Sequence, residues 1–151
     1  MVMERIELLM LRQKVRAVAT LLMDEAPKTC QAILGILPAD FKFITCAWSG
    51  AEILTYLDPP KVLKIEPENL VWDVLPGDLC YYYMAGPVMK EGSYVGTSTT
   101  DYAEIVIYYD RHAKGSGGNL FARITEGLEE FAKAAGRIRW EGAETIRFRR
   151  L

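Results

Sequence analysis

Two residues whose side chains could bind a ligand stand at the ends of apolar runs. Trp48 ends one such run and precedes Ser49-Gly50, a turn signal, while Asn119 directly precedes another run. An indole at a strand end can form the wall of a pocket, because it offers a large apolar face and one N–H donor. The alternative for Trp48 is a buried core position followed by a turn.

Glu104 is the acid best placed for chemistry. It opens an otherwise apolar run and, by strand alternation, shares a face with Val106 and Tyr108. Such a carboxylate is either solvated at the strand start or held in a pocket, where hydrogen bonds or a cation must offset its desolvation. In a pocket it could act as an acid or base toward a small molecule.

A loop that follows Pro67 could add Glu68 and Asn69 to the same site, although both could simply form a turn. The sequence therefore predicts a ligand-binding site at the rim of a β-rich fold, with no catalytic residue assigned. The residues expected to frame it are Trp48, Glu68, Asn69, Glu104, Tyr108 and Asn119. Residues 86–103, rich in Gly, Ser and Thr, could form a mobile cover over it.

Other patterns of reactive residues favour structural roles. Asp110-Arg111-His112 places an acid near a histidine, but no nucleophile-elbow pattern accompanies it, so a solvated loop is favoured. The Gly-rich residues 114–118 lack the order of a phosphate-binding loop and indicate a connection. Three cysteines stand in apolar runs at spacings that fit no zinc pattern: Cys30, Cys46 and Cys80. We expect buried free thiols, and neither a metal nor a cofactor.

Composition narrows the class of protein. The 151 residues predict one domain, residues 1–151, and 18 basic against 20 acidic residues give a net charge of −2. Nucleic acid and anionic membranes are therefore not expected partners. No apolar run approaches the ~20 residues that span a bilayer. Charged residues interrupt the N-terminus too early for a secretory signal, so a cytoplasmic protein is expected; its oligomeric state stays open.

Two helices are expected, one near each end of the chain. Cys30, Ile33, Leu34 and Leu37 recur with helical spacing and predict a helix over residues 27–37, which begins at a proline suited to the first turn. A second helix, over residues 126–135, should bury Leu128 and Phe131 and end at Gly136. Short strands are expected at residues 4–11, 15–23, 41–48, 53–57, 70–74, 79–84, 105–109, 120–124 and 146–149. Many short strands with two helices predict a mainly β fold, a closed antiparallel barrel capped by the helices.

Two distant segments resemble the cyclophilins. The first is the strand, acidic corner and Ala26-Pro27-Lys28-Thr29 that lead into the first helix. The second is Phe121-Ala-Arg-Ile-Thr-Glu-Gly-Leu128, which is similar to the Phe-Gly-Lys-Val-x-Glu-Gly segment before the last cyclophilin helix. The resemblance implies a cyclophilin-like barrel with its two helices at opposite ends.

The prolyl isomerase residues of the cyclophilins are missing from the middle of the chain. Phe43-Ile-Thr-Cys-Ala-Trp-Ser-Gly50 replaces the Phe-His-Arg strand, whose arginine stabilises the twisted prolyl bond. The Trp and His of the proline pocket are also absent. We therefore expect no isomerase activity, unless Arg111 or Arg123 replaces the missing arginine.

Over its whole length the chain is more similar to uncharacterised bacterial and archaeal cyclophilin-like proteins of unknown function. The similarity includes Trp48-Ser-Gly50, Pro76-Gly-Asp78, Gly118-Asn119-Leu-Phe-Ala and Trp140-Glu-Gly-Ala143. It implies the fold but no activity. The expected function is the binding of a small molecule or peptide in a barrel-rim groove; the alternatives are an isomerase with a non-standard site and a small-molecule enzyme that uses Glu104.

Overall fold

A computed structural model describes residues 3–58, 60–86 and 101–151 of the chain. Within these residues it contains two helices and nine strands, whose bounds follow in chain order. They are β1 Arg5–Met10, β2 Val15–Leu21, α1 Pro27–Gly35, β3 Ala39–Thr45, β4 Gly50–Tyr56, β5 Leu70–Val71, β6 Asp78–Met84, β7 Tyr102–Ala113, β8 Gly118–Glu126, α2 Leu128–Glu141 and β9 Glu144–Arg150.

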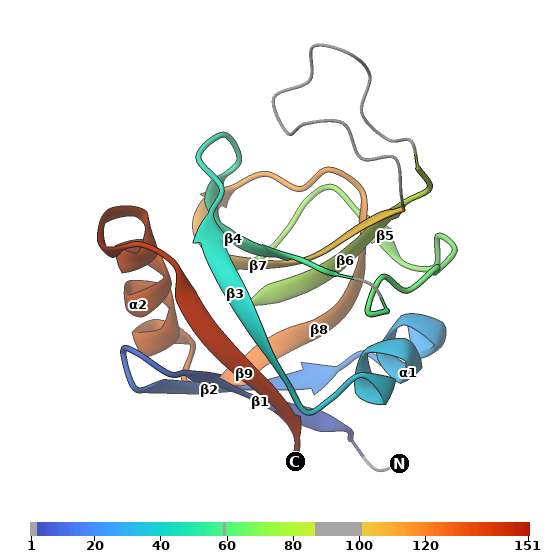
Figure 1. Cartoon of the computed structure of the whole chain (residues 1–151), viewed down its shortest axis with the longest axis horizontal. Helices are drawn as coiled ribbons and strands as arrows, with labels where there is room; N and C mark the ends of the chain where they lie inside the picture. The colour runs from blue at the N-terminus through green and yellow to red at the C-terminus, as the bar shows by residue number, and fades with distance from the viewer. Residues whose placement is uncertain (1–2, 59, 87–100) are drawn as a thin grey trace.

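The strands form the closed antiparallel barrel that the sequence predicts (Figure 1). Neighbouring strands follow the order β2-β1-β9-β3-β4-β7-β6-β8, and β8 pairs again with β2, which closes the sheet. The two-residue strand β5 pairs with the first residues of β8, beyond the part that pairs with β2. Closure leaves no free edge between β2 and β8.

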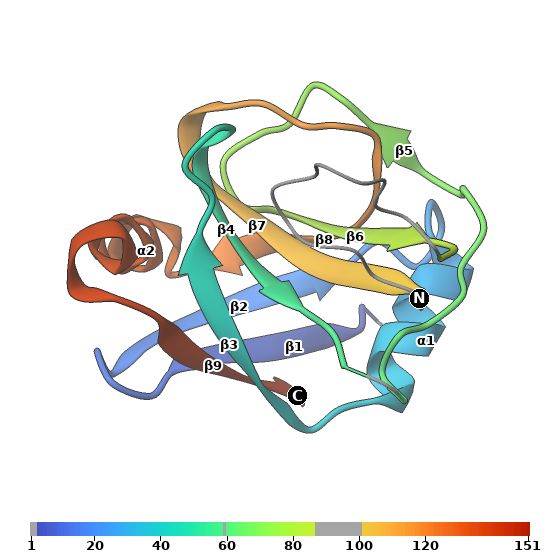
Figure 2. The ribbon, with the colours of Figure 1, turned by 45° about the horizontal axis from the view of Figure 1, so that its top comes forward.

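The two helices lie at opposite ends of the barrel, as predicted (Figures 1 and 2). α1 packs against β8, whereas α2 packs against β2, β3 and β7. Cys30, Ile33 and Phe131 are fully buried. The prediction of full burial is wrong for three leucines at helix ends or flanks, which are half-buried against the core: Leu34, Leu37 and Leu128. Neither helix of the described residues is long and apolar enough to cross a membrane.

α2 is longer than predicted. It continues through Gly136 to Glu141, and Gly142, at φ +97°, ends it by donating its N–H to the carbonyl of Ile138. Burial of Ile138 extends the apolar face beyond Gly136. That packing outweighs the ~1 kcal/mol by which glycine disfavours a helix interior.

Strand alternation produces two apolar clusters. Ile53, Ile105 and Ile107 point into the barrel and join its main core. Their neighbours Leu54 and Val106 point outward into a second, smaller cluster, which Cys46, Cys80, Tyr108 and Leu120 complete. Val71 and Val74, in the segment that carries β5, pack on this outer cluster. The three cysteines are buried free thiols, as expected.

Candidate functional site

Two adjoining cavities lie beside the outer cluster. The first, here called the tyrosine cavity, has a volume of about 420 Å³ and is lined by Tyr81, Tyr82 and Tyr83 of β6 and by the segment around β5. The second, the carboxylate cavity, has a volume of about 200 Å³ and lies between β4 and the start of β7. Glu104 and Ser116 line both, so the two cavities are neighbours, and together they are called the groove here.

Glu104 stands where the two cavities meet. It lies on β7, opposite Tyr56 of β4, and its carboxylate accepts a hydrogen bond from the hydroxyl of Tyr102. Burial raises the pKa of Glu104, although the Tyr102 hydroxyl partly opposes that shift. Glu104 therefore lines both cavities and has a hydroxyl donor at its carboxylate.

Glu52 is a second acid in the carboxylate cavity, and the sequence prediction missed it. It lies on β4, opposite Tyr108, and its exposed fraction is 5%. Burial raises the pKa of Glu52 to about 7, and the nearby charge of Glu104 contributes. The predicted strand began at residue 53. Beginning it at Gly50 would have placed Glu52 on the same face as Leu54, because side chains alternate.

Cys46 and Ser49 complete the polar side of the carboxylate cavity. The Ser49 hydroxyl donates to Cys46 Sγ at 2.9 Å, and the Cys46 thiol lies near the Glu52 carboxylate, whose pKa it helps to lower. Burial raises the pKa of Cys46, so its sulfur is a neutral thiol rather than a nucleophilic thiolate near pH 7. This thiol is therefore a weak donor to the carboxylate.

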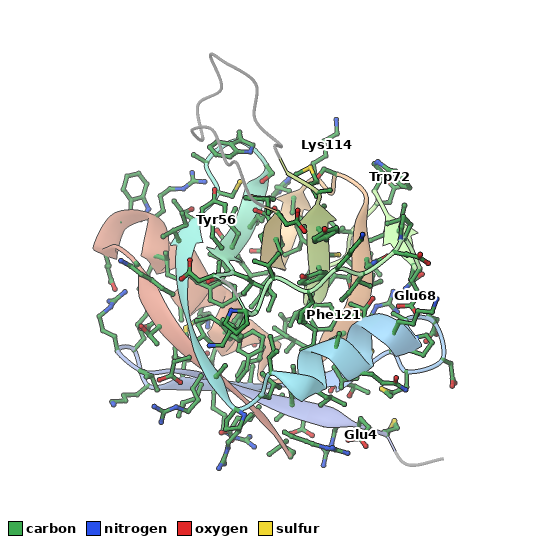
Figure 3. The ribbon with its side chains drawn as sticks, turned by 45° about the vertical axis from the view of Figure 1, so that its right-hand side comes forward. Glu4, Tyr56, Glu68, Trp72, Lys114 and Phe121 are labelled. Carbon is green, nitrogen blue, oxygen red and sulfur yellow. The ribbon has the colours of Figure 1, made fainter. Side chains whose placement is uncertain are left out.

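Aromatic side chains form the walls of the carboxylate cavity. Trp48 occupies the turn between β3 and β4, where 78% of it is exposed, so the core alternative is wrong and the indole borders the cavity. The rings of Tyr56 and Tyr102 lie beside each other, with centroids 5.6 Å apart. The exposed side chain of Lys114 also lines this cavity; Tyr56 and Lys114 are labelled in Figure 3.

Tyr108 supports the tyrosine cavity from beneath. Its side chain is buried, and its hydroxyl is 2.6 Å from the hydroxyl of Tyr82, which lines the cavity. The Tyr82 ring lies against Gly118, where an added Cβ would come within 2.5 Å of the ring. Gly118, the first residue of β8, therefore allows the ring to approach the backbone.

Asn119 borders the tyrosine cavity, but its amide is used within the fold. Its Oδ1 accepts the backbone N–H groups of Glu68 at 2.8 Å and Asn69 at 3.1 Å, and its Nδ2 donates to the carbonyl of Glu66 at 3.0 Å. The Asn69 side chain donates to the carbonyl of Leu120 at 2.9 Å. These bonds attach the segment before β5 to β8.

The side chain of Glu68 turns away from the groove and caps α1 (Figure 3). Its carboxylate accepts the N–H groups of Lys28 at 2.8 Å and Thr29 at 3.0 Å, and the Thr29 hydroxyl at 2.7 Å. Burial would raise the pKa of Glu68, but these donors outweigh it and the pKa is lowered. α1 has no side-chain cap of its own, and a distant acid takes that place.

Of the six predicted residues, the structure brings Trp48, Glu104 and Asn119 to the groove and places Tyr108 beneath it. The side chains of Glu68 and Asn69 instead hold the fold together. The predicted cover falls largely on residues 87–100, outside the described residues. Among the described residues, no three His, Cys, Asp or Glu side chains gather as they would around a metal ion.

The fold and the site make this protein a closed antiparallel barrel with a groove on its outer wall. Comparison with known proteins shows the family to which it belongs. Residues 9–150 match the family described as "Protein of unknown function (DUF3830)", and the chain belongs to it. No curated protein matches the chain.

Two solved structures share the fold. McbB in complex with tryptophan is 15% identical, with a TM-score of 0.68 over 95% of this chain. The chain spans only 44% of McbB. The hypothetical protein AF2241 from Archaeoglobus fulgidus is 20% identical, with a TM-score of 0.58 over 99% of this chain and 96% of that one. At these identities the similarity extends to the fold alone.

Proposed function

We propose that this protein is a cyclophilin-like binding protein that holds a small molecule or a short peptide in the outer groove and has no prolyl isomerase activity. The observation that carries the proposal is that the two cavities lie side by side and share Glu104 and Ser116 in their linings. Binding sites are typically concave and mostly apolar, with a few polar groups that orient the ligand. The tyrosine cavity, at about 420 Å³, falls within the ~300–1,000 Å³ usual for such sites.

The groove supports binding better than prolyl isomerisation. Isomerisation needs a donor positioned over the nitrogen of a twisted prolyl bond. Among the described residues no arginine lines either cavity. Arg123 is engaged with Asp78 at 3.1 Å, and Arg111 is exposed near the far end of β7. Neither residue therefore offers a replacement for the missing arginine.

Ligand screening by thermal shift and by amide chemical shifts tests the binding proposal. The collection should include tryptophan, because McbB of the same fold is in complex with it. A specific ligand at 100 times its Kd stabilises the folded state by about 2.7 kcal/mol. Ser116→Phe, which puts a ring where the cavities meet, should abolish that gain.

Ala143→Phe is the matched control, since Ala143 is exposed after α2 and lines neither cavity. Ala143→Phe should keep the full stabilisation. Ligand stabilisation that survives Ser116→Phe would place the site elsewhere and contradict the proposal.

Acid–base catalysis in the same groove is the second candidate. Its support is that burial raises the pKa of Glu104 and raises the pKa of Glu52 to about 7. A carboxyl group with a pKa of about 7 exchanges protons readily near neutral pH. Turnover of a bound ligand, lost in Glu104→Gln while binding persists, would identify an enzyme. Binding without turnover over pH 5–9 would leave the protein a binding module.

A further inference from the structure

Buried acids elsewhere in the barrel have strong partners. Glu7 accepts hydrogen bonds from Arg16 at 2.6 Å and Arg149 at 2.7 Å, and Asp78 is paired with Arg123 at 3.1 Å. A buried carboxylate without such partners is costly, because desolvation of its charge is not repaid.

The remaining buried acid of this kind, Glu144, accepts the backbone N–H groups of Arg12 at 3.1 Å and Gln13 at 2.9 Å. Glu52 is buried to the same degree as Glu7, with 5% exposed, yet its described partner is only the neutral Cys46 thiol. Glu104 has the Tyr102 hydroxyl. Among the described residues, neither of these two acids forms an ion pair.

The two acids face one cavity from opposite ends. On the paired strands β4 and β7, Glu52 lies opposite Tyr108 and Glu104 lies opposite Tyr56, with Leu54 and Val106 between them. Both acids line the carboxylate cavity, and the apolar Leu54 lines it between them. A group bound in this cavity therefore has a carboxylate at each end.

We infer that the carboxylate cavity binds the protonated amine or guanidinium group of an organic cation, held between Glu52 and Glu104. The inference rests on the proposed function, because it names the ligand class of the same groove. A cation there would supply the charge that the described residues do not provide to Glu52. Tyr56, Tyr102 and Trp48, which line the cavity, also favour a cation, since the faces of aromatic rings attract positive charge.

The sizes of the cavities suggest how such a ligand lies. At about 200 Å³ the carboxylate cavity suits a charged head group rather than a whole ligand. The tyrosine cavity, which continues past Glu104 and Ser116, can take an aromatic or apolar tail against Tyr82. An arylalkylamine has both parts.

Binding of a cation should be linked to proton release. Because the pKa of Glu52 is about 7, this side chain is partly protonated in the free protein near neutral pH, and a bound cation favours its charged form. The other titratable groups in the cavity are Cys46, Tyr56 and Tyr102, whose raised pKa values keep them neutral. The remaining ionisable side chains that line it are the exposed Lys114 and Glu104, whose pKa burial also raises. Affinity should therefore rise as pH increases from 6 to 8.

The test compares 2-phenylethylamine with its neutral analogue 2-phenylethanol, titrated into the full chain at pH 8 and followed by amide chemical shifts. We expect the amine to bind in the groove at least 10-fold more tightly than the alcohol. Glu52→Gln and Glu104→Gln should each weaken the amine at least 10-fold and leave the alcohol unchanged. Glu25→Gln, at an exposed acid before α1, is the matched control and should change neither.

The outcomes separate this inference from the proposed function. Equal affinities for the amine and the alcohol in the groove, or amine binding that both glutamine variants retain, would overturn the inference while the groove remained a binding site. If neither probe shifts groove resonances, the inference is also overturned, and the broader ligand screen then decides whether the groove binds anything. The two glutamine variants act independently, so misfolding of one leaves the other as the test.

Discussion

At the scale of single residues, Glu52 connects the site to the stability of the protein. Its folded-state pKa of about 7 lies above the ordinary value of 4.5, so between these values the folded state binds more protons than the unfolded state. The stability contribution of Glu52 is therefore fully present below pH 4.5 and is lost as pH rises through 7. At neutral pH the raised pKa of Glu52 therefore lowers the stability of the folded protein, and such raised pKa values are common at functional sites.

Glu52→Gln should remove this pH dependence. Between pH 4 and pH 8 we expect the unfolding free energy of the variant to increase by on the order of 3 kcal/mol relative to that of the natural chain, so the variant becomes the more stable of the two. Urea denaturation at several pH values measures the difference. A difference between the two proteins that does not change with pH would show that Glu52 titrates normally.

At the scale of elements, α1 depends on a residue forty positions away. Glu68 accepts three hydrogen bonds from the first turn of this helix, and an N-terminal cap typically contributes about 0.5–2 kcal/mol. Glu68→Ala should therefore lower the unfolding free energy by about 1–2 kcal/mol in urea denaturation. Glu66→Ala is the matched control, because Glu66 is exposed and its carboxylate is 3.9 Å from Lys28. Equal effects of the two changes would contradict capping by Glu68.

Gly136 offers a test of the long second helix. An added Cβ would meet only the ring of Tyr109 at 3.8 Å, an ordinary contact, so Gly136→Ala should raise the unfolding free energy by about 0.5–1 kcal/mol. Gly142→Ala provides the contrast, since Gly142 has a φ of +97° that a Cβ disfavours, and it should destabilise the protein. Thermal and urea unfolding measure both. A destabilising Gly136→Ala would mean that the helix interior is strained at this position.

The helices and strands could be predicted from the sequence where periodicity is strong, whereas the residues of the groove could be predicted only in part. Apolar runs, alternation and helical spacing predicted both helices and a strand at each of the nine strand positions. The bounds of β7 were wrong, because this strand continues to Ala113 through Asp110-Arg111-His112, where the sequence favours a loop. The cap at Glu68 joins segments that only the folded chain brings together, so no local pattern reveals it. Glu52 was missed because an acid next to a turn ordinarily marks a strand end in solvent, while here the strand continues through it. Gly136 was taken for a helix end because tertiary packing, rather than local preference, carries α2 onward.

At the scale of the whole molecule, a barrel of this type does not determine its chemistry, because function depends on the side chains of the site. The outer wall that forms the groove carries carboxylates and tyrosines. Of the two arginines that could replace the missing one, Arg111 is exposed and Arg123 is paired with Asp78. A negatively charged groove does not stabilise the lone pair that forms on a prolyl nitrogen.

We therefore expect a protease-coupled assay on Ala-Pro peptides to show no acceleration above the uncatalysed rate. Arg111→Ala and Arg123→Ala should leave that result unchanged. Acceleration that either alanine variant abolishes would establish an isomerase with a non-standard site and remove the main argument for a binding module.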